Sequence, residues 1–492
     1  MSLLAQLKKY SWIIAAVLFY IVADMILTYR EVYYLNILPV VILIVFLALT
    51  RLDVLYFIII FCTPLSIPLI EYLRTSPIDF YIPTEPILFG VMMLVIFKMV
   101  QNGDINRKVL NHPVTYAILF NLFWIFITSI TSSIPLVSFK FLLARIWFLT
   151  TFYFLAIYIF RNTKNLSVFA WCYTIPLMIV ITYAISRHLA FGLSDKQAAH
   201  VVANPFYRDH TSYGAVLAMI FFAFGGIILR RGNSLILRFL FWISLAYIIL
   251  GLILSYSRAA WISVIICFGI LAVTLLKIRF RYLILFGFLA LIYIFSQRVE
   301  FLQRLEKNRQ DSSADLTEHI QSISNITTDD SNLERLNRWT AALLMFSERP
   351  VFGWGPGTYM FQYAPFQLSS KKTLISTNFG DLGNAHSEYI GPLCESGVLG
   401  SLSFILIAVV ALLTGFKVYN KLKNKRLKQT VLAFILAFIT YLIHGSLNNF
   451  LDTDKASALF WGFIAVFVSL DLYYLPKEEE EAKEKNEELA VK

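Results

Sequence analysis

The chain alternates long apolar runs with short polar breaks over most of its length. Many runs approach 20 residues, which is enough for a helix to cross about 30 Å of hydrocarbon. The pattern predicts an all-α polytopic membrane protein with about 12 to 14 transmembrane helices. The second and third runs are separated only by Arg51, so they are either two short spans or a re-entrant pair. The runs are 11–29, 34–50, 52–70, 83–100, 113–130, 137–160, 165–187, 211–229, 237–254, 259–276, 281–297, 391–416, 429–447 and 456–475.

One long polar segment, residues 298–390, interrupts this series. Its first part, 301–332, has the composition of a linker, whereas 332–350 carries apolar residues at helical spacing before Pro350 ends the predicted helix. This helix lies on the membrane surface or packs over the spans. Its apolar stripe consists of Leu336, Trp339, Thr340, Leu343, Leu344 and Phe346.

The sequence FGWGPGTY follows at 352–359. Glycines at this density permit positive backbone dihedrals, so a tight turn is predicted. A phosphate-cradling loop is the alternative, but no Lys-Ser/Thr pair follows the glycines.

We divide the chain into an N-terminal bundle of about eleven helices (1–297), a loop segment (298–390), C-terminal helices (391–475) and a charged tail (476–492).

Composition supports the membrane assignment, since 58% of residues are hydrophobic and only 15% are charged. The formal charge of +11 does not indicate nucleic acid, because Lys and Arg are concentrated in alternate loops. That asymmetry predicts that both termini are cytoplasmic and that 298–390 is a large loop on the opposite side of the membrane. The four cysteines are scattered and form neither a disulfide framework nor a zinc motif.

The most informative candidate is His386, in NFGDLGNAHSEYIGPLCESGVLG at 378–400, where polar sequence turns apolar again. A neutral imidazole there can take a proton from an acceptor hydroxyl, with Glu388 or Glu395 orienting it. A purely structural histidine is the alternative. Arg145 and Arg258 fall near the outer ends of their helices, on the same side in this topology. Guanidinium groups there either bind a diphosphate or reach headgroups or a carboxylate.

His210, in NPFYRDHTSYGA at 204–215, lies where an outer loop enters a helix, so this segment is a site candidate or a helix cap formed by Asp209 or Thr211. His444 and Asn448, in YLIHGSLNNFLDTDK at 441–455, either hold a sugar or close a hairpin. No histidines recur at metal-ligand spacing, so no essential metal is expected.

Over roughly residues 200–455 the chain resembles the superfamily of O-antigen ligases and O-antigen polymerases, which are bacterial membrane glycosyltransferases. The matching segments are SYSRAAWIS at 255–263, RLNRWTAALLMFSERPVFGWGPGTY at 335–359 and NAHSEYIGPLCESGVLG at 384–400, which includes the spacing of His386, Gly397 and Gly400.

The resemblance implies transfer of a glycan from undecaprenyl diphosphate to an acceptor, on the periplasmic side of the bacterial inner membrane. It implies no cofactor, metal or nucleotide sugar. Ligases use the lipid A core of lipopolysaccharide as acceptor, polymerases another lipid-linked repeat, and a related group protein hydroxyls. The reaction-centre role falls on His386 and the diphosphate-binding role on Arg258, then on Arg145 and Arg338. A transporter of the lipid-linked glycan is the alternative from another class.

Overall fold

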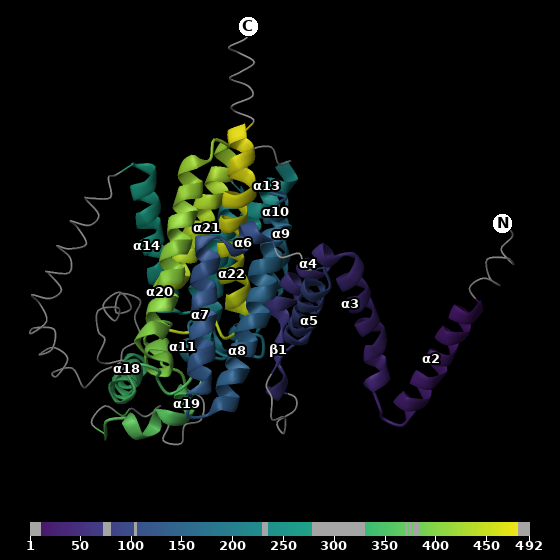
Figure 1. Cartoon of the computed structure of the whole chain (residues 1–492), viewed down its shortest axis with the longest axis horizontal. Helices are drawn as coiled ribbons and strands as arrows, with labels where there is room; N and C mark the ends of the chain where they lie inside the picture. The colour runs from purple at the N-terminus through teal and green to yellow at the C-terminus, as the bar shows by residue number, and fades with distance from the viewer. Residues whose placement is uncertain are drawn as a thin grey trace, which may run out of the picture. The chain divides into compact units, whose positions relative to one another are not determined.

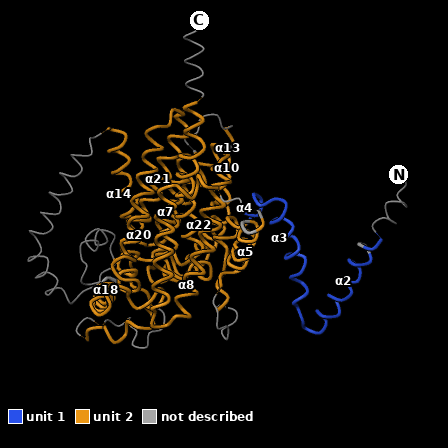
Figure 2. The backbone as a smooth tube through the Cα atoms, viewed as in Figure 1, with its two compact units in different colours: residues 1–58 blue, residues 59–492 orange. Residues whose placement is uncertain are grey.

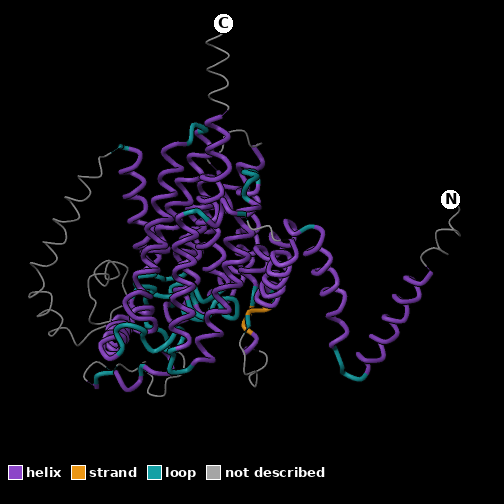
Figure 3. Tube along the Cα trace, viewed as in Figure 1, coloured by secondary structure: helices purple, strands orange, loops and turns teal. Residues whose placement is uncertain are grey.

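The computed structural model describes residues 11–71, 80–102, 106–228, 235–277, 330–369, 372, 376 and 383–480. Nearly all the regular structure in these ranges is helical (Figure 3). They contain eight helices that are long and apolar enough to cross a membrane. The chain is therefore an all-α, multi-pass membrane protein, as the apolar runs predicted. It forms two compact units, residues 1–58 and 59–492 (Figure 2).

The first unit contains α2 (Ser11–Tyr29), the 3-10 turn η1 (Tyr34–Ile37), α3 (Leu38–Thr50) and the start of α4 (Leu52–Cys62). The hydroxyl of Tyr20 donates to the carbonyl of Leu35 at 3.2 Å. Most apolar side chains here are exposed, such as Phe19 at 76%. Exposed apolar helices of this kind are suited to contact with lipid.

The second unit continues from α4 with a series of helices and one small hairpin. Strands β1 (Ile67–Pro68) and β2 (Tyr81–Ile82) pair antiparallel, with Ile67 opposite Ile82. The longer helices are α5 (Thr84–Asn102), α7 (Pro113–Ile130), α8 (Pro135–Leu149), α10 (Asn165–Phe191), α12 (His210–Ile228), α13 (Leu235–Leu254), α14 (Arg258–Leu275), α18 (Asp330–Glu348), α20 (Ile390–Lys421), α21 (Lys425–His444) and α22 (Asp454–Ser469). Shorter elements are η2 (Thr63–Leu65), η3 (Leu69–Glu71), α6 (Arg107–Leu110), η4 (Thr150–Leu155), α9 (Ala156–Ile159), α11 (Lys196–Ala199), α19 (Tyr359–Gln362), η5 (Ala364–Phe366) and η7 (Leu470–Tyr474).

Helix α22 lies at the centre of this unit (Figure 1), because every residue from Asp454 to Ser469 is buried. Its sequence is apolar on all sides, which is typical of a helix without a solvent face. It packs against α8, α9, α12, α20 and α21. Around it, α12 runs along α21, where a Cβ on Gly226 would overlap Ala433. Small residues at such crossings let helix backbones approach closely.

Two of the predicted runs are interrupted. The run 52–70 is helical only to Cys62, after which come η2, β1 and η3. Pro64 and Pro68 explain the break, since neither can donate a helical hydrogen bond. The run 137–160 is divided into α8, the π-helical turn η4 and α9. The predicted span 281–297 and residues 301–329 of the predicted linker 301–332 lie outside the described residues, while 330–332 belong to α18. The domain boundaries therefore stay a prediction.

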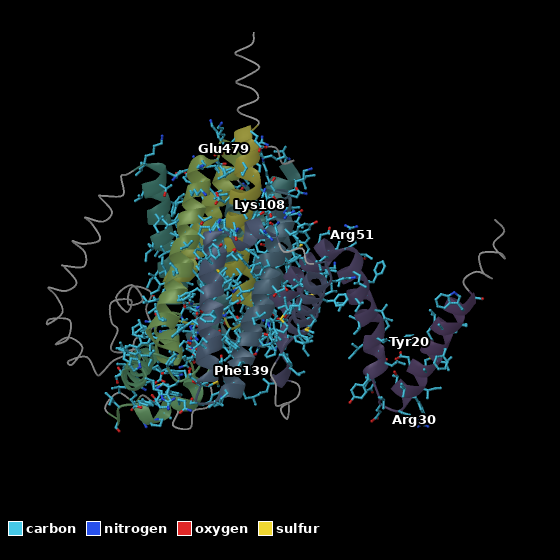
Figure 4. All side chains as sticks on the ribbon, viewed as in Figure 1. Tyr20, Arg30, Arg51, Lys108, Phe139 and Glu479 are labelled. Atoms are coloured by element: carbon cyan, nitrogen blue, oxygen red, sulfur yellow. The ribbon has the colours of Figure 1, made fainter. Side chains whose placement is uncertain are left out.

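Helix α18 matches the predicted helix 332–350, but its buried side differs from the predicted stripe. The buried residues include Asn337, Arg338 and Ala341, whereas Leu343 is 50% exposed. Pairing of the polar groups explains this, as described below. Within the second unit, Lys108 and Glu479 lie toward one end of the helices, and Phe139 lies toward the other (Figure 4).

Candidate functional site

A cavity of about 680 Å³ opens in the second unit. Helix α8 and the segment around His386 form part of its wall. Its wall is built from β2 and α5, from α8, from the start of α12, from α18 and from the connection between α21 and α22. This volume lies within the range of pockets that hold drug-sized ligands. Three residues singled out from the sequence, Arg145, Arg338 and His386, line it together.

His386 occupies a tight turn just before α20. Its φ is +48°, a left-handed conformation that is uncommon for a non-glycine residue. The amide of His386 donates to Asn384 Oδ1 at 3.0 Å, and its carbonyl accepts from Trp339 Nε1 at 3.4 Å. Ser387 Oγ then accepts from the amides of Tyr389 and Ile390, capping α20. These bonds hold the backbone of His386 in place at the cavity wall.

The electrostatic surroundings keep the His386 ring neutral. Burial is the main cause, and together with Arg338 and Arg335 it lowers the pKa of His386 to about 3, while Asp209 acts in the opposite direction. His386 Nδ1 has no hydrogen-bond partner in the described chain. A neutral imidazole with an uncommitted nitrogen can accept a proton.

The two cavity arginines singled out from the sequence are each held by a carboxylate. Arg145 donates to Asp452 Oδ1 at 3.1 Å and lies over the ring of Phe141. Arg338 donates to Glu334 Oε1 at 2.7 Å, with both side chains buried. Such pairs fix the position of a guanidinium group, which has five N–H donors in all and therefore keeps donors for a ligand.

Arg258 does not line the cavity. It is the first residue of α14, is half-buried, and lies near His200, His210 and Arg335. Arg335 was not among the sequence candidates. It precedes Arg338 by three residues on α18, and burial, followed by the nearby Arg258, lowers its pKa. The only available signal was the repeated arginine in LERLNR, which does not reveal which face each arginine takes.

Glu388 and Glu395 have partners other than His386. Glu388 Oε1 accepts from the amides of Phe450 and Leu451 at 2.8 and 3.0 Å and from the Tyr441 hydroxyl at 2.5 Å. Glu395 Oε1 accepts from the amide of Tyr359 at 2.9 Å. The first carboxylate therefore joins the His386 segment to the connection between α21 and α22, and the second joins α20 to the glycine-rich turn.

The histidines at 210 and 444 lie behind the cavity wall. His210 begins α12 and its ring stacks on that of His200, with centroids 4.0 Å apart. Asp209 Oδ1 accepts from the amides of Thr211 and Ser212, so the proposed capping role of Asp209 is confirmed. His444 is 1% exposed. Its Nε2 lies 3.2 Å from Nδ2 of Asn448, which is also buried.

The floor of the cavity contains a lysine that the sequence reasoning missed. Lys455 is 3% exposed and donates to the carbonyl and hydroxyl of Ser66 at 3.0 and 2.7 Å. It also lies 3.4 Å from Asp454 Oδ1 and 4.3 Å from the centroid of Tyr81. A lysine at the start of an apolar run was a usable signal, because an intramembrane charge is costly without partners.

The glycine-rich segment 352–359 forms the predicted tight turn. Gly353, Gly355 and Gly357 all have positive φ. The amide of Gly353 donates to Arg349, and the amides of Trp354 and Gly355 donate to the carbonyls of Cys394 and Glu395. Because these amides are occupied, they do not cradle a phosphate. The turn instead holds α18 against α20.

The described residues contain no group of three or more His, Cys, Asp or Glu side chains placed to hold a metal ion. The polar groups at the cavity are arginines, lysines, a neutral histidine, amides and paired carboxylates. Such a set is suited to anion binding and proton transfer.

Two comparisons with known proteins cover the segment that contains His386 or much of the chain. A curated Haemophilus influenzae protein, described as uncharacterized, is 22% identical over 303 residues, which is 60% of this chain and 72% of the relative. The family model described as O-antigen ligase matches residues 243–405, a range that includes Arg258, α18, the glycine-rich turn and His386. Over these residues the chain is similar to the O-antigen ligase family.

Proposed function

We propose that the protein is an O-antigen ligase that moves a glycan from undecaprenyl diphosphate to the lipid A core of lipopolysaccharide, at the periplasmic face of the bacterial inner membrane. One observation carries the proposal: His386, with an uncommitted ring nitrogen, shares a cavity with two positioned arginines. The family match makes a lipid-linked glycan the natural donor class. In this proposal the enzyme needs neither a metal nor a cofactor, since the donor already carries its leaving group.

In the proposed reaction the acceptor hydroxyl gives its proton to His386 as its oxygen bonds to the anomeric carbon of the donor sugar. The bond between that carbon and the diphosphate oxygen breaks, and the electron pair leaves with the diphosphate. Arg145 and Arg338 stabilise the charge that develops on this leaving group. The cavity aligns the two reactants and excludes water from the reacting carbon.

Arg258 and Arg335 supply a second pair of guanidinium groups close to His210. Two like charges that are partly buried near each other repel unless an anion lies between or beside them. Asp209 is one such group. In our proposal the donor diphosphate is another, and it extends from the cavity toward Arg258.

The test uses lipopolysaccharide ladders from a deletion strain that carries wild type, His386→Ala or Arg258→Ala at matched expression. We expect both variants to lose glycan attachment and to accumulate lipid-linked polymer, because one loses the proton acceptor and the other a diphosphate contact. Arg51→Ala is the matched control, because Arg51 forms an exposed pair with Asp53 in another part of the chain.

The accumulated material distinguishes the alternatives within the superfamily. Single repeats still attached to the core would identify a polymerase, and loss of glycan from a protein would identify an O-oligosaccharyltransferase. Full attachment in both variants would exclude the assigned site. Turnover of a defined donor and acceptor by purified protein in detergent would exclude a transporter without chemistry.

A further inference from the structure

The turn that joins α18 to the glycine-rich segment exposes apolar side chains. Val351 is 57% exposed and Phe352 is 42% exposed, and Leu343 near the end of α18 is exposed as well. The same helix buries the polar side chains of Asn337 and Arg338. Because an exposed apolar patch marks contact with a protein, a ligand or a membrane, this turn requires a partner.

The apolar turn adjoins the outward surface of α20. The amide of Val398 in this helix donates to the carbonyl of Pro350 at 3.1 Å. Val398, Leu399 and Leu402 are all exposed. Helix α20 is long and apolar enough to cross a membrane, so these side chains face lipid. The exposed surface of the turn therefore continues the lipid-facing surface of a membrane helix.

Contacts with α7 show how far along the membrane helices the turn reaches. The ring of Phe352 stacks on that of Trp124, with centroids 5.7 Å apart and planes at 17°. Trp124 precedes Ile130, the last residue of α7, by six residues, which is about 9 Å along a helix axis. The carbonyl of Trp354 accepts from the amide and hydroxyl of Ser133, just beyond that helix end, at 2.9 and 2.7 Å. The chain thus passes from the end of α7 at Trp354 to a deeper level at Phe352.

Polar and amphipathic side chains border the apolar turn. Glu348 and Arg349, which precede it, are exposed. The Arg349 guanidinium lies 4.0 Å from the centroid of the Trp354 ring, whose Nε1 donates to the carbonyl of Met345 at 2.9 Å. Tryptophan collects where hydrocarbon meets headgroups, and arginine there keeps its charge in the polar layer. An apolar tip with such a border matches the two layers of a bilayer leaflet.

We propose that residues 350–352, which we call the wedge, insert into the hydrocarbon of the membrane leaflet on the side of the cavity. Helix α18 then lies along that leaflet, with Leu343 toward the lipid. In Figure 1 this helix is seen nearly end-on beside the lower part of α20. The partner is the acyl chains of the bilayer, because the wedge is apolar and continuous with a membrane-spanning surface.

The wedge is connected to the cavity through α18. Arg338 of this helix lines the cavity, and its NH1 donates to the carbonyl of Asn384 at 3.3 Å. Trp339 Nε1 donates to the carbonyl of His386 at 3.4 Å. Insertion of the wedge therefore fixes the depth of the cavity wall relative to the lipid headgroups. This inference concerns only the position of α18 and does not depend on the proposed reaction.

The test uses full-length protein in liposomes of phosphatidylethanolamine and phosphatidylglycerol, with a nitroxide spin label on one introduced cysteine. Val351→Cys and Phe352→Cys each place the label on the wedge, so the test survives if one of them fails to fold. Phe123→Cys, at an exposed apolar position of α7, is the lipid reference. Lys425→Cys, at the exposed start of α21, is the water reference. Labelled wild type gives the background from the native cysteines.

Relaxation of the label by two reagents reports its surroundings, because oxygen concentrates in hydrocarbon and a charged nickel chelate stays in water. We expect oxygen to relax the label more than the chelate does at positions 351 and 352, as at 123, and the reverse at 425. Stronger relaxation by the chelate at both wedge positions would overturn the proposal. Weak relaxation by both reagents would also overturn it, because a second copy of the chain or another protein would then cover the wedge.

Discussion

Adjacent residues of the His386 segment have different partners. His386 lines the cavity, Ser387 caps α20, and Glu388 accepts two hydrogen bonds from the connection between α21 and α22 and a third from Tyr441 of α21. The carboxylate nearest to the histidine in sequence therefore supports the cavity wall. It stabilises the backbone on which Asn449 to Asp452 face the cavity.

Glu388 gives a prediction for stability against pH. Burial, followed by the nearby Asp452, raises its pKa to about 7, against roughly 4.3 in an unfolded chain. Between these values the folded state binds a proton that the unfolded state releases. The stabilising contribution is thus complete below the unfolded pKa and is lost as the pH rises through about 7.

We expect the melting temperature of wild type to decrease as the pH is raised from about 5 to about 8. In Glu388→Gln, whose side chain does not titrate, the melting temperature should change less over the same range. Melting of purified protein in detergent measures this. Glu348→Gln, at the exposed end of α18, serves as control. Parallel curves for wild type and Glu388→Gln would contradict the assignment.

The sequence indicated His386 and Arg145, because a polar residue at the edge of an apolar run is conspicuous, and the family resemblance added Arg338. It did not indicate Arg335 or Lys455. The importance of Arg335 depends on its facing Arg258 across a long stretch of chain, and that of Lys455 on contacts with Ser66 and Tyr81. Such tertiary contacts leave no periodic signal in a single sequence.

At the scale of elements, the backbone contact between the glycine-rich turn and α20 positions the cavity wall. Helix α20 contains a break at Gly397, where φ is +72° and ψ is −171°. A Cβ at this position would overlap the carbonyl of Val351, and the next amide, that of Val398, donates to Pro350 at 3.1 Å. Only glycine fits both the dihedral angles and the space.

Gly397→Ala is therefore expected to destabilise the protein by about 1–3 kcal/mol from backbone strain, with steric overlap in addition. Gly269→Ala in α14 is the matched control, since a Cβ added there would meet no atom within 4 Å, and alanine favours helix. Thermal unfolding in detergent measures both. Equal melting temperatures for the two variants would show that the break at Gly397 is not required.

Helix boundaries that depend on local sequence were predicted well, whereas some internal breaks were not. The helices α2, α7 and α10 begin and end close to the predicted runs, because length and apolarity define a membrane helix. The end of α4 and the π turn η4 were missed. The first depends on two prolines within an apolar run, and the second has no sequence signal that we recognise.

At the scale of the whole molecule, charge asymmetry predicts that Lys108 and the tail are cytoplasmic and that the far end of α7 is periplasmic. Lys108 and Thr131 are exposed on either side of α7. We expect a membrane-impermeant maleimide to label Thr131→Cys in intact spheroplasts and to label Lys108→Cys only after permeabilisation. Wild type controls for the native cysteines, and the reverse labelling would invert the topology.

The enclosed position of α22 has a consequence for biosynthesis. Among the described membrane helices it is the last to leave the ribosome, yet its neighbours surround it on every side. The helices synthesised earlier must therefore leave a slot open, or separate again, until this final segment enters the bilayer. Because Lys455 and Ala456 in the first turn of α22 line the cavity, the cavity is completed only at that moment. A nascent chain that stops before α22 would be inserted in the membrane but would lack part of the cavity wall.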